Sequence, residues 1–354
     1  MILVDFEKDS VIRQHFNDVD QNVLDFILEW KSKSDKITVF TSGSTGEPKS
    51  IELQKDYMKA SVQMSIDAFL LDKNDVFVCN LSTESIAGKM MIVRAFELKA
   101  KLISISPSSN PIPDLHEFER LAGTTFDSFV FAFVPMQIKM SISSIANLRL
   151  LKRAKVILIG GASIPEDLEA QLIELHLPFK ATYGMTETIT HIAVRNLNDK
   201  EFTALPKVKL ENSDRNTLKI AAPSTGFEWI ETNDLVLLNE TKDKFQILGR
   251  ADNVINSGGV KIQLEKVESQ LTQISGHTLF CFGLPDETLG TKLCCTYIES
   301  NDITLNREIF KGKMPNFEIP KMFYPLAEFK YTKSGKIDKL RTIDAYIEPQ
   351  VSNK

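Results

Sequence analysis

The 354-residue sequence predicts an α/β fold with a large N-terminal domain of mostly parallel sheet flanked by helices, and a small C-terminal α+β domain. Short apolar runs alternate with stretches whose apolar residues recur at helical spacing, which is typical of strand–helix–strand units. The runs at residues 76–79, 129–134 and 156–159 are apolar almost throughout, as strands covered on both faces require. After about residue 253 the pattern changes to paired strands around one helix.

Composition excludes several classes of protein. The chain is 43% hydrophobic and 25% charged, which is ordinary globular composition. Its net charge is −5 and no block of basic residues stands out, so the sequence does not favour a nucleic-acid-binding protein. No apolar run reaches the ~18 residues of a membrane span, and the N-terminus does not resemble a signal peptide. We therefore expect a cytoplasmic protein with buried free thiols and no zinc site; the cysteines are Cys79, Cys281, Cys294 and Cys295.

Residues 41–49, Thr-Ser-Gly-Ser-Thr-Gly-Glu-Pro-Lys, form the first candidate site. A β-branched run at residues 37–40 predicts a strand before it, and apolar spacing at residues 51–71 predicts a helix after it. Glycines allow close backbone approach, and hydroxyls with a lysine suit a polyphosphate. Pro48 stands where the Walker phosphate loop needs glycine, so that pattern fails. The alternative is a flexible surface turn; the candidates are Thr41, Ser42, Gly43, Ser44, Thr45, Gly46 and Lys49.

Two further candidates follow predicted strands. After the strand at residues 156–159, the residues 160–165 (Gly-Gly-Ala-Ser-Ile-Pro) are either a strand–helix turn with Pro165 at the first helical position, or a ligand site at a strand's carboxyl end. In the stretch 179–188, Tyr183 offers a flat face for a base, Gly184 lets the backbone come close, and Thr186 offers a hydroxyl. Glu187 offers an oxygen ligand for Mg²⁺. The alternative is a solvent-facing loop.

The rest of the chain contributes Thr232, Asn233 and Asp234 before a predicted strand, and a Gly-Arg-Ala-Asp segment at residues 249–252. A helix is expected from about Leu264, then two strands at residues 280–287 and 293–298. Near the end, Lys336 follows Gly335 in a turn, while Lys333 and Lys339 are interpreted as surface charges.

These motifs, in this order, resemble the signatures of the adenylate-forming superfamily of acyl-CoA synthetases, luciferases and peptide-synthetase adenylation domains. The resemblance implies that a carboxylate is activated with ATP and Mg²⁺ and then transferred to CoA. It implies residues 1–249 as the ATP- and acyl-binding domain, residues 250–252 as a hinge with Asp252 as pivot, and residues 253–354 as the small, mobile domain. It further implies that Lys336, Glu187 and Lys49 are catalytic, with Glu187 at the metal. Beyond the first loop, the implied ATP-binding residues are Gly161, Ala162, Tyr183, Gly184, Met185, Thr186, Asp234 and Arg250.

Within the superfamily, Tyr-Gly-Met-Thr-Glu-Thr-Ile-Thr-His-Ile-Ala and Ser-Ile-Ala-Gly-Lys-Met-Met resemble the compact o-succinylbenzoate–CoA ligases of menaquinone biosynthesis. The early first motif suggests that much of the usual N-terminal subdomain is absent. Two departures are Asn233, where the family has glycine, and Glu84-Ser85, where many relatives carry an aromatic–His pair. Asn tolerates left-handed backbone angles, so the turn that the resemblance implies at residues 232–234 is still expected. The alternatives are another aryl- or acyl-CoA ligase, or a non-catalytic nucleotide-binding module; an oligomer is possible. The acyl and CoA candidates are Lys89, Thr188, His191, Gly258 and Gly259; Lys89 and Arg94 either meet a second carboxylate or are helix-surface charges.

Overall fold

The computed structural model describes residues 1–41, 49–299, 304–331 and 337–347, except for the side chains of residues 41 and 49. The chain divides into two compact units. The first comprises Met1–Asn212, Lys219–Thr232 and Leu238–Gln246, and the second comprises Ser213–Leu218, Asn233–Leu237 and Ile247–Lys354. The hinge at residues 250–252 stays a prediction.

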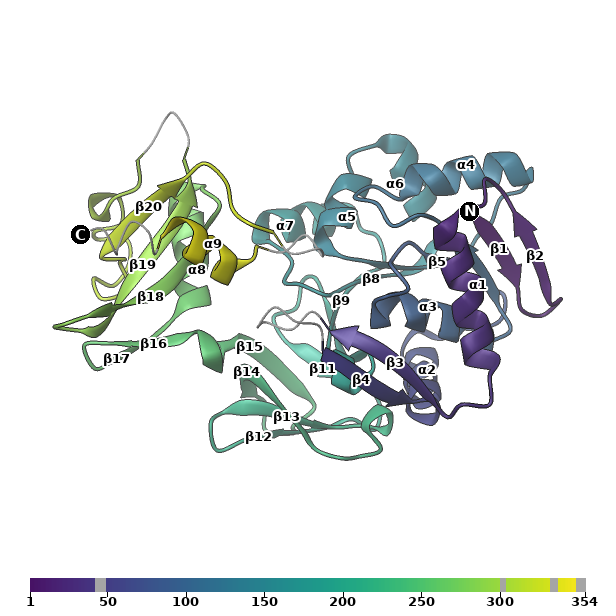
Figure 1. Cartoon of the computed structure of the whole chain (residues 1–354), viewed down its shortest axis with the longest axis horizontal. Coiled ribbons are helices and arrows are strands. Elements are labelled where there is room, and N and C mark those ends of the chain that lie inside the picture. The colour runs from purple at the N-terminus through teal and green to yellow at the C-terminus, as the bar shows by residue number, and fades with distance from the viewer. Residues whose placement is uncertain (42–48, 300–303, 332–336, 348–354) are drawn as a thin grey trace. The chain divides into compact units, whose positions relative to one another are not determined.

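The helices and strands alternate through the first part of the chain, as expected (Figure 1). In order they are β1 (Ile2–Asp5), β2 (Ser10–Arg13), α1 (Asp18–Lys31), β3 (Lys36–Thr41), β4 (Lys49–Gln54), α2 (Lys55–Phe69), β5 (Val76–Cys79), α3 (Ile86–Glu97), β6 (Lys101–Ser104), α4 (Ile112–Ala122), β7 (Phe129–Phe133), α5 (Pro135–Ser141), α6 (Ile145–Leu151), β8 (Ala154–Ile159), α7 (Glu166–Glu174), β9 (Phe179–Gly184), β10 (His191–Asn196), β11 (Phe202–Ala204), β12 (Lys209–Asn212), β13 (Thr217–Ala221), β14 (Ile230–Leu238), β15 (Lys244–Arg250), β16 (Val254–Ser257), β17 (Val260–Gln263), α8 (Leu264–Ser275), β18 (Leu279–Asp286), β19 (Gly290–Ile298), β20 (Met322–Leu326) and α9 (Lys339–Tyr346).

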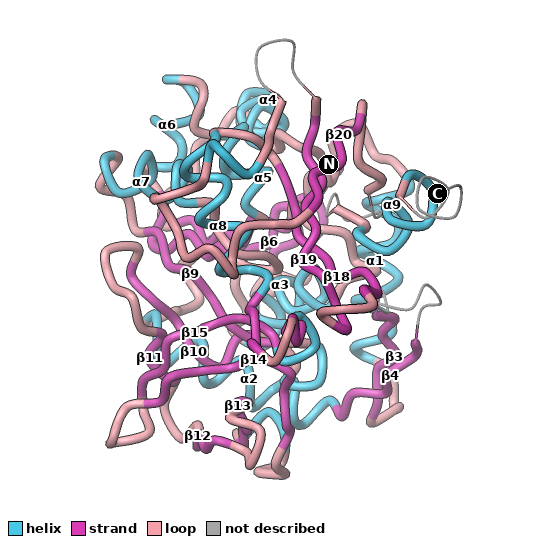
Figure 2. The backbone as a smooth tube through the Cα atoms, turned by 90° about the vertical axis from the view of Figure 1, so that its left-hand side faces the viewer, coloured by secondary structure: helices cyan, strands magenta, loops and turns pink. Residues whose placement is uncertain are grey.

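The main sheet of the first unit has the strand order β11-β10-β9-β8-β7-β5-β6-β1-β2. Its centre, from β9 to β6, is parallel, which confirms the predicted doubly covered sheet. Both flanks are antiparallel, with β1 and β2 on one side and β10 and β11 on the other. Residues Phe202 and Thr203 of β11 also pair with Phe245 and Lys244 of β15, and these strands run side by side (Figure 2).

Each central strand buries alternate side chains in two different cores, because successive residues of a strand point to opposite faces. On β5, Phe77 and Cys79 pack with α1, α2 and α3, whereas Val76 and Val78 pack with α4 to α7. Burying a Val, Leu, Ile or Phe side chain contributes ~1.5–3 kcal/mol, so the two cores hold the sheet firmly in place. The carboxyl ends of the parallel strands are thereby fixed relative to one another.

The segment before α2 differs from the prediction. Residues 51–54 were expected to begin a helix, but they belong to β4, which pairs with β3 in a separate two-stranded antiparallel sheet. The helix begins at Lys55, whose backbone N–H donates to Asp35 O at 2.8 Å. Lys55 is only 7% exposed, and its ammonium donates to the carbonyls of Glu29, Trp30 and Ser32 at 3.0, 2.8 and 3.1 Å. This cation therefore caps the last turn of α1, where the helix dipole favours positive charge.

The second unit is a small α+β structure. Its sheet has the order β17-β16-β19-β18, and β20 pairs in parallel with β19. Leu264, Val267 and Leu271 of α8 pack with the cysteines at positions 281 and 295 of β18 and β19. All four cysteines of the chain are buried and free.

The 232–234 segment also differs from the prediction. It was expected to be a turn, but all three residues lie within β14, so Asn233 has no left-handed turn to satisfy. At the start of α7, Pro165 occupies the N-cap position rather than the first helical position.

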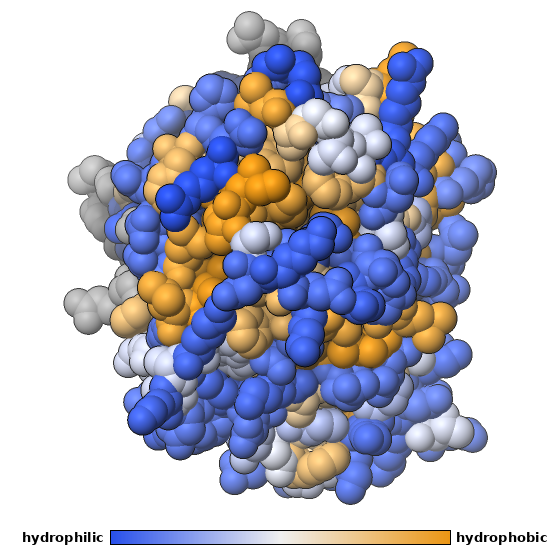
Figure 3. Space-filling view, turned by 90° about the vertical axis from the view of Figure 1, so that its right-hand side faces the viewer, coloured by the Kyte–Doolittle hydropathy of each residue, from blue (hydrophilic) through white to orange (hydrophobic). Residues whose placement is uncertain are grey.

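One side of the first unit exposes apolar side chains. Val11 and Ile12 of β2, Phe16 and Leu28 are all exposed. Figure 3 views the side where Figure 1 has β1, β2 and α1, and it shows apolar residues among hydrophilic ones. Within the described ranges, no helix is long and apolar enough to cross a membrane.

Candidate functional site

The stretch from Tyr183 to His191 closes a tight hairpin between β9 and β10. Gly184 pairs with His191, and a register shift follows before Tyr183 pairs with Ala193. A single 3₁₀ turn, Thr186–Thr188, spans the tip. The Thr188 hydroxyl is fully buried; it accepts the Met185 N–H at 3.0 Å and lies 2.9 Å from Thr190 O. The predicted motif thus occupies one compact turn.

Ile189 adopts an unusual backbone conformation, with φ 69° and ψ −60°. The N–H of Thr190 donates to Thr188 O at 2.9 Å, which makes residues 188–190 a γ-turn centred on Ile189. A positive φ is a genuine outlier for a β-branched residue, and strain of this kind costs ~1–3 kcal/mol. The turn folds the chain back onto Gly184.

Gly184 is needed because of that close approach. A Cβ at this position would lie 2.2 Å from Thr190 O and 2.7 Å from the His191 Cα, both of which are backbone atoms. The neighbouring Tyr183 ring packs edge-on against Phe245, with centroids 5.0 Å apart, and lies 5.9 Å from Phe202. The aromatic side chains of β11 and β15 therefore support the tyrosine from one side.

Glu187 is exposed at the tip of the turn, and its carboxylate makes no hydrogen bond or ion pair with any residue that the structure describes. Within the same described residues there is no cluster of three His, Cys, Asp or Glu side chains that could hold a metal. Mg²⁺ is usually bound by one or two carboxylates together with substrate phosphates, so a single free carboxylate fits this ion.

The carboxyl end of β8 lies beside this hairpin. β8 and β9 are hydrogen-bonded parallel neighbours, with Ile159 opposite Ala181, so their carboxyl ends share one edge. A Cβ on Gly160 would lie 2.3 Å from the Thr182 hydroxyl, and Gly161 has a φ of +79°. The structure therefore brings Gly161 and Ala162 to the same edge as the Tyr183 motif.

The first predicted loop is placed only by its ends. Residue 41 ends β3 and residue 49 begins β4, and the two pair across the hairpin. Ser42, Gly43, Ser44, Thr45 and Gly46 lie outside the described residues, as do the side chains of Thr41 and Lys49. Their roles stay predictions.

The acyl candidates divide into two groups. His191 is buried, with Nε2 3.1 Å from the Ser65 hydroxyl and Nδ1 3.5 Å from the Thr190 hydroxyl. Burial, and secondarily the charge of Arg94, lowers the pKa of His191 well below its usual 6.5. Lys89 instead lies over the Phe26 ring at 4.2 Å, against α1, and burial lowers its pKa.

Arg94 is not a helix-surface charge. Its side chain belongs to α3 and the residue is 2% exposed. Nε donates to the Ser65 hydroxyl at 3.2 Å, and a terminal nitrogen lies 3.5 Å from the Thr190 hydroxyl. No carboxylate in the described part of the chain pairs with it. Burial lowers the pKa of Arg94 to about 10, so the guanidinium is charged near pH 7.

In the second unit, the predicted ribose and hinge residues contact one another. Arg250 donates to both carboxylate oxygens of Asp252, at 2.9 and 2.8 Å, and lies 3.4 Å from Asp234. The hydrogen bonds from Arg250 lower the pKa of the Asp252 carboxyl, and the positive charge of Arg250 lowers it further. The hairpin between β16 and β17 turns through Gly258 and Gly259, both with positive φ (60° and 86°), as a tight two-residue turn requires.

Lys336 lies outside the described residues, but the chain on either side of it is held in place. Tyr331 bridges Ile337, and the Asp338 N–H donates to Lys330 O at 2.8 Å. Lys339 was interpreted as a surface charge; it forms an ion pair with the largely buried Glu268 of α8 at 2.6 Å. Sequence patterns carried no signal for this pair.

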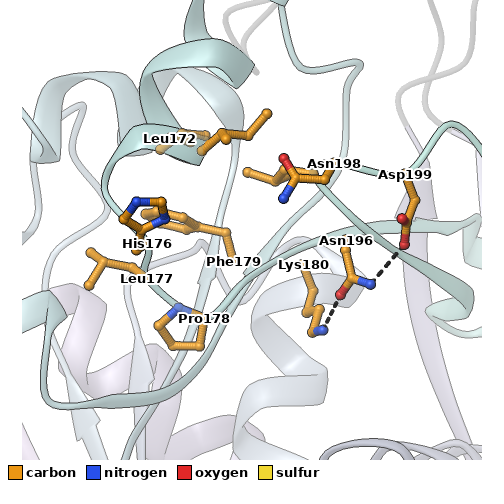
Figure 4. Close-up of a pocket in the computed structure, with 11 residues that line it drawn as sticks. Leu172, His176, Leu177, Pro178, Phe179, Lys180, Asn196, Asn198 and Asp199 are labelled. Carbon is orange, nitrogen blue, oxygen red and sulfur yellow. Dashed lines mark hydrogen bonds between the residues drawn. The ribbon is translucent and has the colours of Figure 1, made fainter.

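A surface cavity of about 330 Å³ lies at the other end of β9, away from the hairpin (Figure 4). His176, Leu177, Pro178 and Phe179 form one wall, and the Lys180–Asn196–Asp199 chain of hydrogen bonds forms the other. It lies at the amino end of β9, whereas open α/β sheets bind ligands at the carboxyl ends of their strands.

Several known proteins resemble this chain in sequence or in fold. Residues 5–226 match the family described as AMP-binding enzyme. A 2-succinylbenzoate–CoA ligase of Staphylococcus epidermidis is 23% identical over 360 residues, covering 92% of this chain and 73% of the relative. The crystal structure of an acyl-CoA synthetase (AMP-forming)/AMP-acid ligase II-like protein from Dyadobacter fermentans is 32% identical, with a TM-score of 0.61, covering 94% of this chain and 96% of that one. An o-succinylbenzoate coenzyme A synthetase from Bacillus subtilis, in complex with ATP and magnesium ion, is 18% identical with a TM-score of 0.71, covering 86% and 69%; this likeness concerns the fold.

Proposed function

Because the chain belongs to the AMP-binding enzyme family, we propose that it is an AMP-forming acid–CoA ligase whose acid is o-succinylbenzoate. The observation that carries the proposal is the β9–β10 hairpin, which places Tyr183, Gly184 and Glu187 in one turn at the carboxyl edge of the sheet. The choice of acid is supported by the 2-succinylbenzoate–CoA ligases of Staphylococcus epidermidis and Enterococcus faecalis among the relatives.

The proposed reaction has two balanced steps. First, a carboxylate oxygen of the acid bonds to the α-phosphorus of ATP, the bond from that phosphorus to the β-bridging oxygen breaks, and pyrophosphate leaves. Next, the CoA sulfur bonds to the acyl carbon, the bond between that carbon and the AMP oxygen breaks, and AMP leaves. The thiol proton passes to solvent.

In this proposal the hairpin binds the nucleotide. The Tyr183 ring stacks against the adenine, and Gly184 lets the backbone approach it. Glu187 holds Mg²⁺, which would shield the charge on the phosphates. Gly161 and Ala162 line the same edge of the sheet, and the hydroxyls and Lys49 of the first loop contact the departing pyrophosphate.

The remaining roles follow the resemblance. Lys336 stabilises the charge that develops at the α-phosphate by electrostatics. Asp234 and Arg250 bind the ribose, Asp252 is the pivot between the two steps, and Gly258 and Gly259 admit the CoA arm. Thr188 and His191 form a wall of the acyl site. Lys89 is engaged by Phe26 and Glu29 of α1, so we assign it no substrate contact.

Pyrophosphate release with a panel of acids tests the proposal. With ATP, Mg²⁺ and CoA, o-succinylbenzoate should give the highest kcat/KM and a CoA thioester product. Release with benzoates or fatty acids but not with o-succinylbenzoate would replace the acid and leave the enzyme class intact. No release with any acid would favour a nucleotide-binding module without catalysis.

Lys336→Ala separates the two steps. The variant should lose adenylation by at least ~100-fold, because electrostatic stabilisation of the transition state is removed. It should keep most of its thioester formation when it is given preformed o-succinylbenzoyl-adenylate. Lys333→Ala, in the same segment, is the matched control and should retain both steps. Equal loss of both steps in Lys336→Ala would contradict the assigned role.

The proposal includes a cytoplasmic location, where ATP and CoA are available to such an enzyme. The four free, buried cysteines support it, because thiols stay reduced there.

A further inference from the structure

The γ-turn at Ile189 combines backbone strain with burial. Ile189 is 1% exposed and packs with α2, α3 and the sheet, yet its φ is 69°. Strained residues persist only where the surrounding structure over-determines their conformation, and they cluster at functional sites. This turn directly follows Glu187 and sets the approach of Thr190 to Gly184.

One lock on the turn is local. The buried Thr188 hydroxyl accepts the Met185 N–H at 3.0 Å and lies within hydrogen-bond distance of Met185 O and Thr190 O. It therefore ties the first residue of the turn to the last, across Glu187. A local lock fixes the shape of the turn but does not fix its position on the sheet.

A second lock comes from α2 and α3. Arg94 reaches the Ser65 hydroxyl of α2 and the Thr190 hydroxyl of the turn, and Ser65 also contacts His191 at 3.1 Å. The four side chains satisfy one another if His191 is neutral and carries its proton on Nε2. Ser65 then accepts from Arg94 and His191 while it donates to Ser61 O at 3.1 Å, and Thr190 accepts from Arg94 and donates to His191 Nδ1.

This network offers a reason why Arg94 is buried although no carboxylate among the described residues pairs with it. A charge that is removed from water needs compensating contacts, but the partners of Arg94 are all neutral: two hydroxyls and the Met91 sulfur. We therefore look for a benefit other than stability. Here the benefit is position, because the rigid fork of a guanidinium holds two partners in fixed directions.

We propose that Arg94, directly through Thr190, and Ser65, through His191, are positioning residues that hold the strained turn. They thereby fix the Glu187 carboxylate for the divalent cation that accompanies a nucleoside triphosphate, whereas Gly184 is held by β9 itself. This inference rests on the proposed function only for the identity of the nucleotide site; it does not depend on which acid is used.

Equilibrium binding of a non-hydrolysable ATP analogue, with and without Mg²⁺, tests the proposal without turnover. Arg94→Met should reduce the gain in affinity that Mg²⁺ provides by about tenfold, as loss of an outer partner of a metal ligand does. Affinity without Mg²⁺ should change less than about threefold, because the phosphates are then bound without the Glu187 site. Arg94→Lys should recover part of the loss, since it keeps the charge without the fork.

Two further variants keep the test decisive if Arg94→Met folds poorly. Thr190→Val removes only the hydroxyl that Arg94 reaches, and it should show the same Mg²⁺-specific loss. Ser65→Ala should show a smaller loss in the same direction. Its matched control is Ser61→Ala on the same helix, whose buried hydroxyl has no partner among the described residues and whose loss should leave both affinities unchanged.

Several outcomes would overturn the inference. One is an equal loss of affinity with and without Mg²⁺ in folded Arg94→Met and Thr190→Val. Another is unchanged analogue binding together with a raised KM for the acid, which would make Arg94 an acid-binding residue. If wild-type protein binds the analogue with Mg²⁺ dependence but releases no pyrophosphate, the proposed function fails while the positioning role is still judged by binding.

Discussion

The turn at residues 185–190 and the segment at residues 250–252 both carry predicted ligand-binding residues, but different kinds of interaction fix the two segments. The turn is fixed by buried hydrogen bonds between neutral groups and one enclosed guanidinium. The segment is fixed by an ion pair whose side chains are 46% and 50% exposed. Exposed ion pairs contribute ~0–1 kcal/mol and weaken with salt, whereas buried hydrogen bonds enforce one geometry. The turn therefore suits a fixed binding surface, and little free energy from this ion pair would oppose the change of conformation that the proposed pivot requires.

Gly184→Ala should break the first half of the comparison most severely. The new Cβ would meet backbone atoms at 2.2 and 2.7 Å, so the turn must move away from β9. We expect a loss of ~3 kcal/mol in the free energy of unfolding and, in protein that folds, a loss of activity of ~100-fold. Urea unfolding and pyrophosphate release measure the two effects.

Gly123→Ala is the matched control for that variant. Gly123 has a positive φ, 62°, which Gly184 does not have, but nothing lies within 4 Å of its Cβ position. It should cost only ~1–2 kcal/mol, the strain of a Cβ at a left-handed φ, and leave activity unchanged. Similar costs for the two variants would show that the close approach of Thr190 does not constrain the turn.

A pH series sharpens the comparison with an intermediate effect. Because the pKa of His191 in the folded protein lies well below 6.5, the unfolded chain takes up a proton at a higher pH than the native one. The contribution of His191 to the free energy of unfolding is therefore fully present above pH 6.5. It is lost as the pH falls toward the pKa that His191 has in the folded protein, by up to ~1.4 kcal/mol per pH unit.

His191→Gln removes the titration and keeps an amide near Ser65. The urea midpoint should therefore fall less between pH 7.5 and pH 5.5 in the variant than in the wild type. Parallel losses in the two proteins would mean that His191 is accessible to protons and that the network around it is open.

The smallest effect is expected at the exposed segment. Asp252→Asn removes the ion pair with Arg250, and the free energy of unfolding should fall by less than ~1 kcal/mol. The difference from wild type should shrink in 1 M salt, where the Debye length is ~3 Å. A large, salt-independent loss would show that the segment is as rigid as the turn and would remove the contrast between them.

Much of the fold could be predicted because burial on both faces leaves a plain pattern. Residues 76–79 and 129–133 are apolar throughout, so the central strands were found correctly. β4 was assigned to the following helix because Ile51 and Leu53 fit the apolar spacing of both structures. The turn expected at residues 232–234 came from resemblance alone, and the hydrogen bonds of β14 override it.

The candidate site was predictable in its motifs but not in its supports. Arg94 was left open as a surface charge, although the residues around it, Met90 to Val93 and Ala95, are all apolar and mark a helix buried on every side. That signal could have placed it. Ile189 offered no such signal, because a β-branched residue argues against positive φ and only the pairing of β9 with β10 enforces it.

The cap that the Lys55 ammonium forms on α1 has a consequence for local unfolding of the first unit. A single ammonium holds the end of α1 while its own backbone begins α2, and the β3–β4 hairpin lies between the two helices in the chain. None of these elements can detach without exposing that charge's carbonyl partners to water. Native-state hydrogen exchange should therefore show their amides exchanging together as one cooperative unit. The hairpin at the base of the first predicted ligand loop would then open only together with these two helices.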